Sequence, residues 1–355
     1  MSIATEPIGS IPRPAELIAA FADRHAGKIS QEDFDAVAES ALRDTIERFQ
    51  ETGSPVITDG EQTKPSFATY PIAGLPNLAP DGVVIPFADG HTRQLPRLTA
   101  GPFRYATYAS QYLGVAKRLT NLPVKQAVIS ASALSLLYPA QEIPNYPREA
   151  FLSDLVNEAA TDIRQCLAQG ADSVQIDFTE GRLSLKLDPT GGLLESFVAL
   201  NNRVLDLLSP AELDRTGVHV CPGGDRDATH SADIDYAGLL PALFRLRVKR
   251  FYLQLASEKD PKRVLNIVRQ HLPPDPTVKV FVGVIDPINP AVETPQEVCE
   301  RVLLAAEYLP PSQLGTTDDC GFSPFADDVS TSRDVAFAKI RARVEGTRLA
   351  AAKCG

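Results

Sequence analysis

Eight short apolar runs alternate with longer amphipathic stretches along the 355-residue chain, and this alternation limits the possible folds more than any other feature. The runs lie at about 5–9, 55–59, 124–130, 173–177, 217–221, 250–255, 278–285 and 313–317. Mostly apolar strands separated by helices are typical of a parallel sheet that is buried on both faces. Eight such units predict an α/β fold, a closed (β/α)8 TIM barrel, with an open doubly wound sheet as the alternative. No GxGxxG motif follows an early strand, which argues against a dinucleotide-binding sheet.

Helix-capping signals support this division. Ser30-Gln-Glu-Asp33 is a variant of the capping box and predicts a helix that runs to Gln50 and ends before Gly53. Thr294-Pro-Gln-Glu297 is a full capping box with proline at the first helical position, so a helix is expected from there to about Tyr308.

The regular alternation is interrupted after the second strand. Residues 65–122 are rich in proline, glycine and aromatic residues, and a hairpin is expected between 83–86 and 94–98. We interpret the chain as a single barrel domain over residues 1–355. The irregular segment 65–122 would then be an insertion that forms a lid.

Composition excludes several classes of protein. The formal net charge is −10, which argues against nucleic acid as a partner. No apolar run reaches the roughly 18 residues that a membrane helix needs, and the N-terminus does not resemble a signal peptide. The five cysteines are odd in number and show no framework spacing, as expected in a reducing compartment. A cytoplasmic protein without membrane contact is expected, and the sequence does not indicate its oligomeric state.

The segment TGVHVCPGGD (216–225) places His219 and Cys221 at the end of a predicted strand. Residues i and i+2 of a strand point to the same side. Cys320, in TTDDCGF, follows the last strand in a similar position. One imidazole and two thiolates would form a three-ligand site for Zn²⁺ with an open fourth position. The alternative is that these are ordinary buried core residues.

Other polar residues also follow predicted strands, and a barrel gathers such groups at one mouth. They are Ser10, Asp59, Glu61, Asp177, Gln254, Asp286 and Asp319. Four histidines lie outside this set and are expected on the surface: His25, His91, His230 and His271. His230 is close enough to the loop after the fifth strand that a place in the site is the alternative for it.

Six segments, in order and spread over nearly the whole chain, resemble the catalytic domain of cobalamin-independent methionine synthase and its single-domain relatives. They are IGSIPRP (8–14), VITDGEQTKPSF (56–67), SVQIDFTEG (173–181), HVC (219–221), GVIDPINP (283–290) and DDCGF (318–322). The resemblance implies a (β/α)8 barrel and methyl transfer to a zinc-activated thiolate, as in 5-methyltetrahydropteroyltriglutamate–homocysteine methyltransferase.

The resemblance also implies roles for individual residues. The metal ligands would be His219, Cys221 and Cys320. The loop of Ile8, Gly9 and Ser10 would hold an amino-acid thiol, while Glu61 and Asp177, as catalytic and substrate-binding carboxylates, would grip its ammonium group. Backbone N–H groups and a hydroxyl suit the carboxylate of such a substrate, and paired acids suit its ammonium.

Three features depart from the pattern of this family. The fourth zinc ligand is a glutamate in the family but matches Gln254 here, and a neutral amide is a poor zinc ligand. The family's histidine after strand seven matches Ile288. The chain has no tryptophan, on which the family stacks folate, so the methyl donor is not expected to be folate.

The sequence therefore indicates a zinc-dependent methyl- or alkyltransferase of methionine biosynthesis, acting on a homocysteine-like thiol and a small-molecule donor. Thiol alkylation of the epoxyalkane–coenzyme M transferase kind is an alternative within the superfamily. A non-catalytic binding barrel is an alternative from another class, motivated by Gln254 and Ile288. A decarboxylase of the uroporphyrinogen type is less consistent with the acidic mouth, near which only Arg13 and Arg182 are expected.

Overall fold

Seven parallel strands form the central sheet of the computed structural model, which describes residues 3–354. Their order around the sheet is β1-β13-β12-β11-β8-β7-β6. The bounds are Ala4–Thr5 (β1), Gln126–Ile129 (β6), Val174–Asp177 (β7), Thr216–Val220 (β8), Arg250–Leu253 (β11), Lys279–Ile285 (β12) and Leu314–Asp318 (β13). Seven of the eight predicted strands are thus confirmed to within about four residues at each end.

The eighth predicted strand, 55–59, fills the gap between β6 and β1. Ile57 forms a parallel bridge with Val124, and the Lys125 N–H donates to the Ile57 carbonyl at 2.8 Å. On the other side, the Thr58 hydroxyl donates to the carbonyl of Gly9 at 2.8 Å. This segment forms a single bridge rather than a full ladder, in part because Pro55 has no N–H to contribute. The sheet therefore closes into the expected barrel, and the open doubly wound sheet is excluded.

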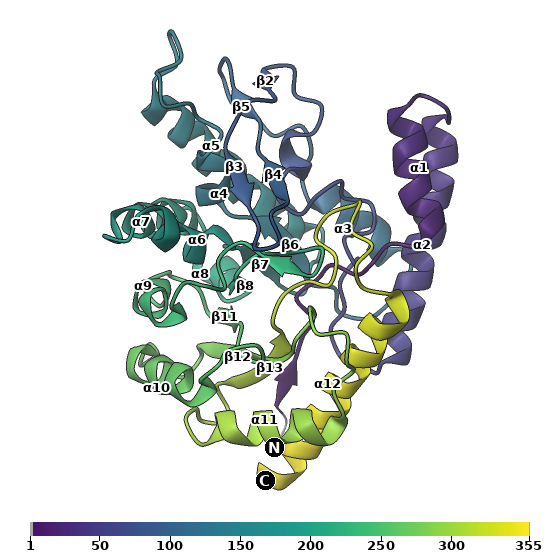
Figure 1. Cartoon of the computed structure of the whole chain (residues 1–355), viewed down its shortest axis with the longest axis vertical. Coiled ribbons are helices and arrows are strands. Elements are labelled where there is room, and N and C mark those ends of the chain that lie inside the picture. The colour runs from purple at the N-terminus through teal and green to yellow at the C-terminus, as the bar shows by residue number, and fades with distance from the viewer. Residues whose placement is uncertain (1–2, 355) are drawn as a thin grey trace.

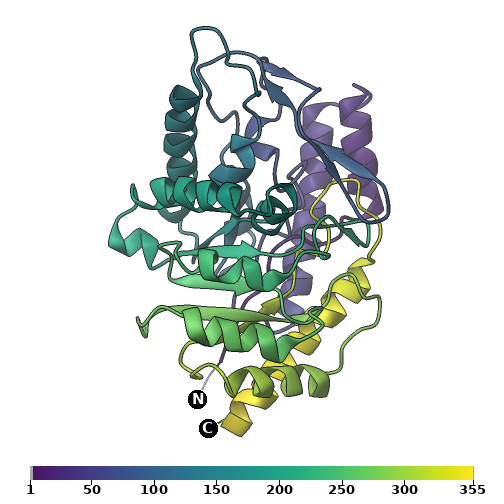
Figure 2. The ribbon, with the colours of Figure 1, turned by 60° about the vertical axis from the view of Figure 1, so that its left-hand side comes forward.

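Helices surround the barrel (Figures 1 and 2). The long ones are α1 (Ala15–His25), α2 (Gln31–Glu51), α5 (Arg148–Ala168), α7 (Gly192–Leu205), α10 (Pro261–His271), α11 (Pro295–Ala306) and α12 (Arg333–Cys354). The shorter ones are α3 (Ser110–Lys117), α4 (Ala131–Ser135), α6 (Glu180–Leu187), α8 (Pro210–Leu213), α9 (Leu240–Leu243), η1 (Tyr70–Ile72) and η2 (Tyr236–Gly238). The sequence pattern does not indicate α3 or α6.

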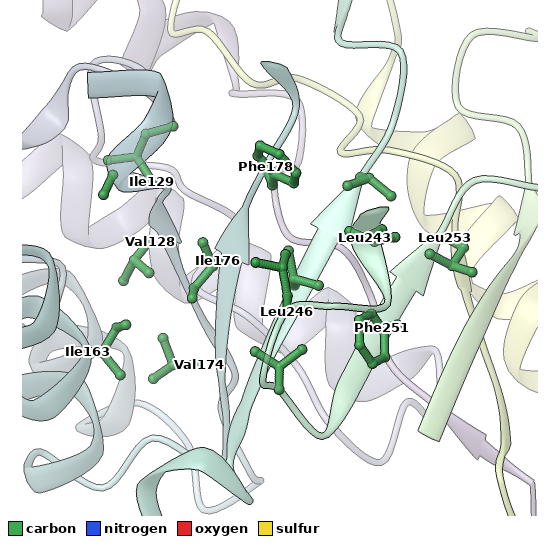
Figure 3. Close-up of a cluster of buried hydrophobic side chains, with 14 of the residues drawn as sticks. Val128, Ile129, Ile163, Val174, Ile176, Phe178, Leu243, Leu246, Phe251 and Leu253 are labelled. Carbon is green, nitrogen blue, oxygen red and sulfur yellow. The ribbon is translucent and has the colours of Figure 1, made fainter. Parts of the chain in front are cut away.

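The main core lies between the strands and the surrounding helices. Figure 3 shows side chains of several strands, such as Val128 of β6, Ile176 of β7 and Phe251 of β11, together with Ile163 of α5 and Leu243 of α9. All are buried. Because the outer faces of the strands are apolar, the helices cover them, and polar groups are left for the barrel interior and its mouth.

The segment 65–122 carries two small antiparallel sheets. β3 (Val84–Pro86) pairs with β4 (Thr92–Gln94), so the expected hairpin is present, but its second strand is 92–94 and not 94–98. Residues 97–98 instead form β5 (Arg97–Leu98), which pairs with β2 (Leu78–Ala79). A third small sheet joins β9 (Gly224–Asp225) and β10 (Ala228–Thr229) just after β8. The Ala88 N–H donates to the Thr229 carbonyl at 2.9 Å, so the β3–β4 hairpin contacts the loop that follows His219 and Cys221. None of the helices among residues 3–354 combines the length and apolar character that crossing a bilayer requires.

Both predicted capping boxes are present, and the one at α11 gives a test of the local sequence reasoning. The Thr294 hydroxyl accepts from the Glu297 N–H at 3.2 Å, and the Glu297 carboxylate accepts from the Thr294 N–H at 2.7 Å. We expect Thr294→Ala to lower the free energy of unfolding by about 1 kcal/mol, measured by urea denaturation. Thr161→Ala, which removes a hydroxyl inside α5 that bonds only the Asn157 carbonyl among the described residues, is the control and should change stability by less than about 0.5 kcal/mol. Equal losses in the two variants would contradict a capping role.

Candidate metal centre

The carboxyl ends of β8 and β13 bring three possible ligands together. His219 lies in β8, Cys221 directly follows it, and Cys320 lies two residues beyond β13. The ligand atoms of these three residues all lie within 4.8 Å of one another, and the two Sγ atoms are 3.0 Å apart. Residues 99 positions apart thus meet at one point, as the barrel geometry requires.

His219 shows most directly that this cluster suits a metal ion. Its side chain is buried, and within the described part of the chain neither Nδ1 nor Nε2 has a hydrogen-bond partner. An unsatisfied buried imidazole is costly, whereas coordination would satisfy one nitrogen. One imidazole and two sulfurs form a soft donor set that fits a metal such as zinc.

The pKa values of the two thiols are shifted in opposite directions. A hydrogen bond from the Cys221 thiol, with a further contribution from His219, holds the pKa of Cys320 well below its usual value. Burial, together with that same hydrogen bond, raises the pKa of Cys221. The Cys320 thiol therefore loses its proton more readily than the Cys221 thiol. A metal ion would remove the second proton as well, since thiolates are its ligands.

A small cavity opens beside the cluster. It is lined by residues from several strand ends: Ile8, Gly9, Ser10, Glu61, Phe67, Ala127, Asp177, Thr179, His219, Gly223, Gly224, Cys320, Gly321 and Pro324. The structure therefore brings together the five candidate substrate-binding residues and two of the three candidate ligands around one space.

Glu61 and Asp177 give this cavity an acidic wall. Glu61 has a left-handed backbone (φ 53°), and its carboxylate accepts from the Lys64 ammonium at 3.0 Å. Although burial lowers the pKa of Lys64, the nearby Glu61 and Asp59 carboxylates raise it, so Lys64 stays charged. Burial, and repulsion by Glu61, raise the pKa of Asp177 to about 6. A cationic ligand group would stabilise both carboxylates in their charged form.

The loop 8–10 is held in place by the chain around Cys320. The Ser10 carbonyl accepts from the Phe322 N–H at 3.0 Å, and its hydroxyl accepts from the Ser323 N–H at 3.2 Å. Gly321 makes this approach possible, because a Cβ at that position would lie 2.1 Å from Ser10 Oγ. The Ile8 N–H donates to Asp318 at 3.4 Å, so that amide is already engaged.

Gln254, at the position of the family's fourth ligand, has its amide engaged elsewhere. Its Oε1 accepts from Arg182 at 3.0 Å, and its Nε2 donates to Ser257 Oγ at 2.7 Å. Arg182 also donates to Glu258 at 2.8 Å. These bonds favour a structural role for Gln254, and among residues 3–354 the metal-ligand cluster contains only His219, Cys221 and Cys320.

Asp286 and Ile288 lie near the mouth as well. The Asp286 carboxylate accepts from the Ile288 N–H at 3.0 Å, which is a loop-stabilising contact. A Cβ on Gly224 would lie 4.0 Å from Ile288 Cδ1, so this apolar side chain lies beside the loop that follows β8.

Two polar residues near the site are not identified by the sequence analysis. The expectation that His230 lies on the surface is wrong: it is buried, and its Nε2 lies only 1.7 Å from where a Cβ on Gly223 would be. Gly223, with φ 70°, lets the loop close on the ring. Glu180, in the unexpected helix α6, is also buried. No spacing in the sequence signals either residue, because loop closure determines both positions.

Comparisons with known proteins agree with the resemblance described above. No protein-family model matches the chain. The chain is 22% identical to the methionine synthase of Pyrococcus horikoshii, over 97% of this chain and 92% of that protein. It is 25% identical to the 2-hydroxypropyl-CoM lyase of Xanthobacter autotrophicus, over 99% of this chain and 96% of that protein. A B12-independent methionine synthase from Shewanella sp. W3-18-1, solved with selenomethionine, has the same fold, with a TM-score of 0.76 at 20% identity and coverage of 100% and 99%.

Proposed function

Because its relatives over nearly the full chain are named methionine synthase, we propose that this chain is a zinc-dependent transferase that places a methyl or alkyl group on the thiol of a homocysteine-like amino acid. The observation that carries the proposal is the cluster of His219, Cys221 and Cys320 beside a cavity whose wall holds two carboxylates. In this proposal the thiol and the ammonium of one substrate would bind beside each other.

His219, Cys221 and Cys320 would hold the zinc ion. Zinc bound there would lower the pKa of a substrate thiol and so supply the nucleophile at neutral pH. Glu61 and Asp177 would hold the ammonium of the same substrate by charged hydrogen bonds. The loop 8–10, fixed against Phe322 and Ser323, would face its carboxylate. We further propose that residues 65–122 act as a lid over this mouth and exclude water.

Thiol alkylation without an amino-acid substrate is the second candidate, favoured by the relative named 2-hydroxypropyl-CoM lyase. Two buried carboxylates on one wall suit an amino-acid thiol better than a sulfonate, because a sulfonate would be repelled. A non-catalytic barrel is less consistent with the unpartnered imidazole of His219.

Metal analysis combined with zinc-edge absorption tests the proposal. We expect about one zinc per chain. Homocysteine should add one sulfur neighbour to the zinc, and coenzyme M should do so only at much higher concentration. A protein that purifies without metal and whose thermal stability does not change with added zinc would contradict the proposal. The reverse order of the two thiols would support the second candidate instead.

A further inference from the structure

Arg13 is a buried arginine between the loop 8–10 and α1, and all its donors are bonded to the main chain. The acceptors are five carbonyls: Gln62 at 3.1 Å, Ser323 at 3.3 Å, Phe325 at 3.0 Å, Glu61 at 2.6 Å and Lys64 at 2.8 Å. A guanidinium has five N–H groups, so none is left for a ligand. Burial lowers the pKa of Arg13 to about 10, and the side chain therefore stays charged at neutral pH.

The five carbonyls belong to two loops that meet at the cavity. The loop 61–64 carries Glu61 and Lys64, and the segment 323–325 follows the candidate ligand Cys320. The loops also bond to each other, since the Phe67 N–H donates to the Pro324 carbonyl at 3.1 Å. Only a planar fork of donors can reach carbonyls on both sides at once. A lysine ammonium, with three donors on one atom, cannot make the same set of bonds.

The main chain of Glu61 depends on this contact more than its neighbours do. Glu61 has φ 53°, a left-handed conformation that is unfavourable for a residue with a side chain. Such a backbone persists where the surroundings enforce it. Here the Glu61 carbonyl accepts from Arg13, and the Glu61 N–H donates to Asp59 Oδ1 at 2.9 Å. Both polar groups of this peptide are thus engaged while the residue lines the cavity.

The candidate metal ligand Cys320 is held by a separate set of bonds. The carboxylate of Asp319, the residue before it, accepts from the N–H groups of Leu255, Ala256 and Ser257 at 2.8, 2.8 and 2.7 Å. These bonds join the chain at Cys320 to the loop after β11 without involving Arg13. A change at Arg13 should therefore displace Glu61 and leave the three-residue cluster in place.

We propose that Arg13 is a positioning residue for the proposed reaction. It keeps Glu61 in its left-handed conformation and so places that carboxylate where it meets the ammonium group of the amino-acid thiol. Arg13 contributes in this way to the choice of thiols that carry an ammonium group, and it does not contribute to metal binding. The inference rests on the proposed function for the identity of the substrate, and on the contacts of Arg13 for the positioning.

Hydrogen–deuterium exchange of the purified protein tests the positioning without any thiol. Arg13→Lys keeps the charge and loses the fork of donors. Exchange of the backbone amides in 61–67 and 321–326 should become faster on the order of tenfold, because local opening of both loops becomes easier. The matched control is Arg215→Lys. Arg215 donates to the carbonyls of Ala171 and Asp172 before β7, at the other end of the barrel, so its replacement should leave both loops unchanged.

A double-mutant cycle tests whether Arg13 acts through Glu61. The dissociation constants of homocysteine and of 4-mercaptobutyrate, which lacks the amino group, are measured by calorimetry on the zinc-loaded protein. Arg13→Lys should weaken homocysteine about tenfold, the effect of losing one hydrogen bond between charged groups, and 4-mercaptobutyrate less than about twofold. In a Glu61→Gln background the same substitution should change homocysteine binding less than about twofold, since effects that share one contact do not add. Zinc content should stay that of the unmodified protein.

Unchanged exchange in the two loops of Arg13→Lys would overturn the inference, as would additive effects in the cycle or loss of zinc. If Arg13→Lys does not fold, Arg13→Gln, whose amide donates at most two hydrogen bonds, takes its place in both measurements. The two proposals fail separately. Faster exchange in both loops of a protein that binds neither zinc nor homocysteine would contradict the proposed function and support the positioning. Normal binding of zinc and homocysteine, with exchange and thiol preference unaffected by Arg13→Lys, would contradict the inference alone.

Discussion

Replacing Cys320 by alanine is expected to remove the bound metal and the transferase activity together. Cys320 supplies one of three ligand atoms that lie within 4.8 Å of one another, and the remaining His219 and Cys221 would form a two-residue site. Metal activation of a nucleophile contributes several kcal/mol, so activity should fall on the order of 10³-fold. Zinc content, measured on the purified variant, should fall below about a tenth of that in the unmodified protein.

Cys299→Ala is the matched control for this loss. Cys299 is a buried cysteine of α11 and is not a member of the ligand cluster. Its replacement should reduce stability slightly and leave the zinc content unchanged. A Cys320→Ala protein that keeps a full equivalent of zinc and normal activity would refute the assigned ligand set, as would equal zinc loss in both variants.

Replacing Asp177 by asparagine is expected to abolish recognition of the substrate's ammonium. A hydrogen bond between charged groups contributes about 1.5–3 kcal/mol, so KM for homocysteine should rise on the order of 10- to 100-fold. The comparison thiol is 4-mercaptobutyrate, which lacks the amino group. The unmodified protein should discriminate strongly between the two thiols, and Asp177→Asn should discriminate little.

The orientation of Asp177 makes this variant informative. Gln175 donates to Asp177 Oδ1 at 2.7 Å, and Lys125 in turn donates to Gln175 Oε1 at 2.8 Å. Asparagine has nearly the same shape and can keep the contact with Gln175, so the substitution removes the negative charge and leaves the side chain in the same place. Asp162→Asn, a buried acid bonded to Tyr70 outside the cavity, is the control. If it changes the thiol preference as much as Asp177→Asn does, or if Asp177→Asn changes nothing, the assigned contact is wrong.

The local elements followed from the sequence because their causes are local. Apolar runs of strand length predicted seven ladder strands, and the boxes at Ser30 and Thr294 predicted the starts of α2 and α11. These signals depend on residues within a few positions of one another, so no tertiary information was needed. The segment 55–59 is predicted as a full strand but forms one bridge, because its proline has no N–H to donate and a turn ends the segment.

The sequence also predicts the kind of chemistry that the residues at the strand ends support. Histidine and cysteine two positions apart, with a second cysteine after the last strand, are unusual enough to indicate soft-metal chemistry. The barrel prediction then implied that they would meet, and the structure places the two sulfurs 3.0 Å apart. The closed fold, rather than the spacing, is responsible for that distance.

Only the tertiary structure decided the remaining features, because each depends on contacts between distant segments. His230 is buried since the loop after β8 folds back on Gly223, and Gln254 is engaged because Arg182 of α6 reaches it. Glu180 has one satisfied and one unpartnered oxygen because Ser130 and Ser132 approach from about 50 positions away. The sequence by itself determined the elements and the type of chemistry, which local patterns encode. Packing decided which polar atoms have hydrogen-bond partners and which are left for a ligand, because burial and hydrogen bonding depend on the whole fold.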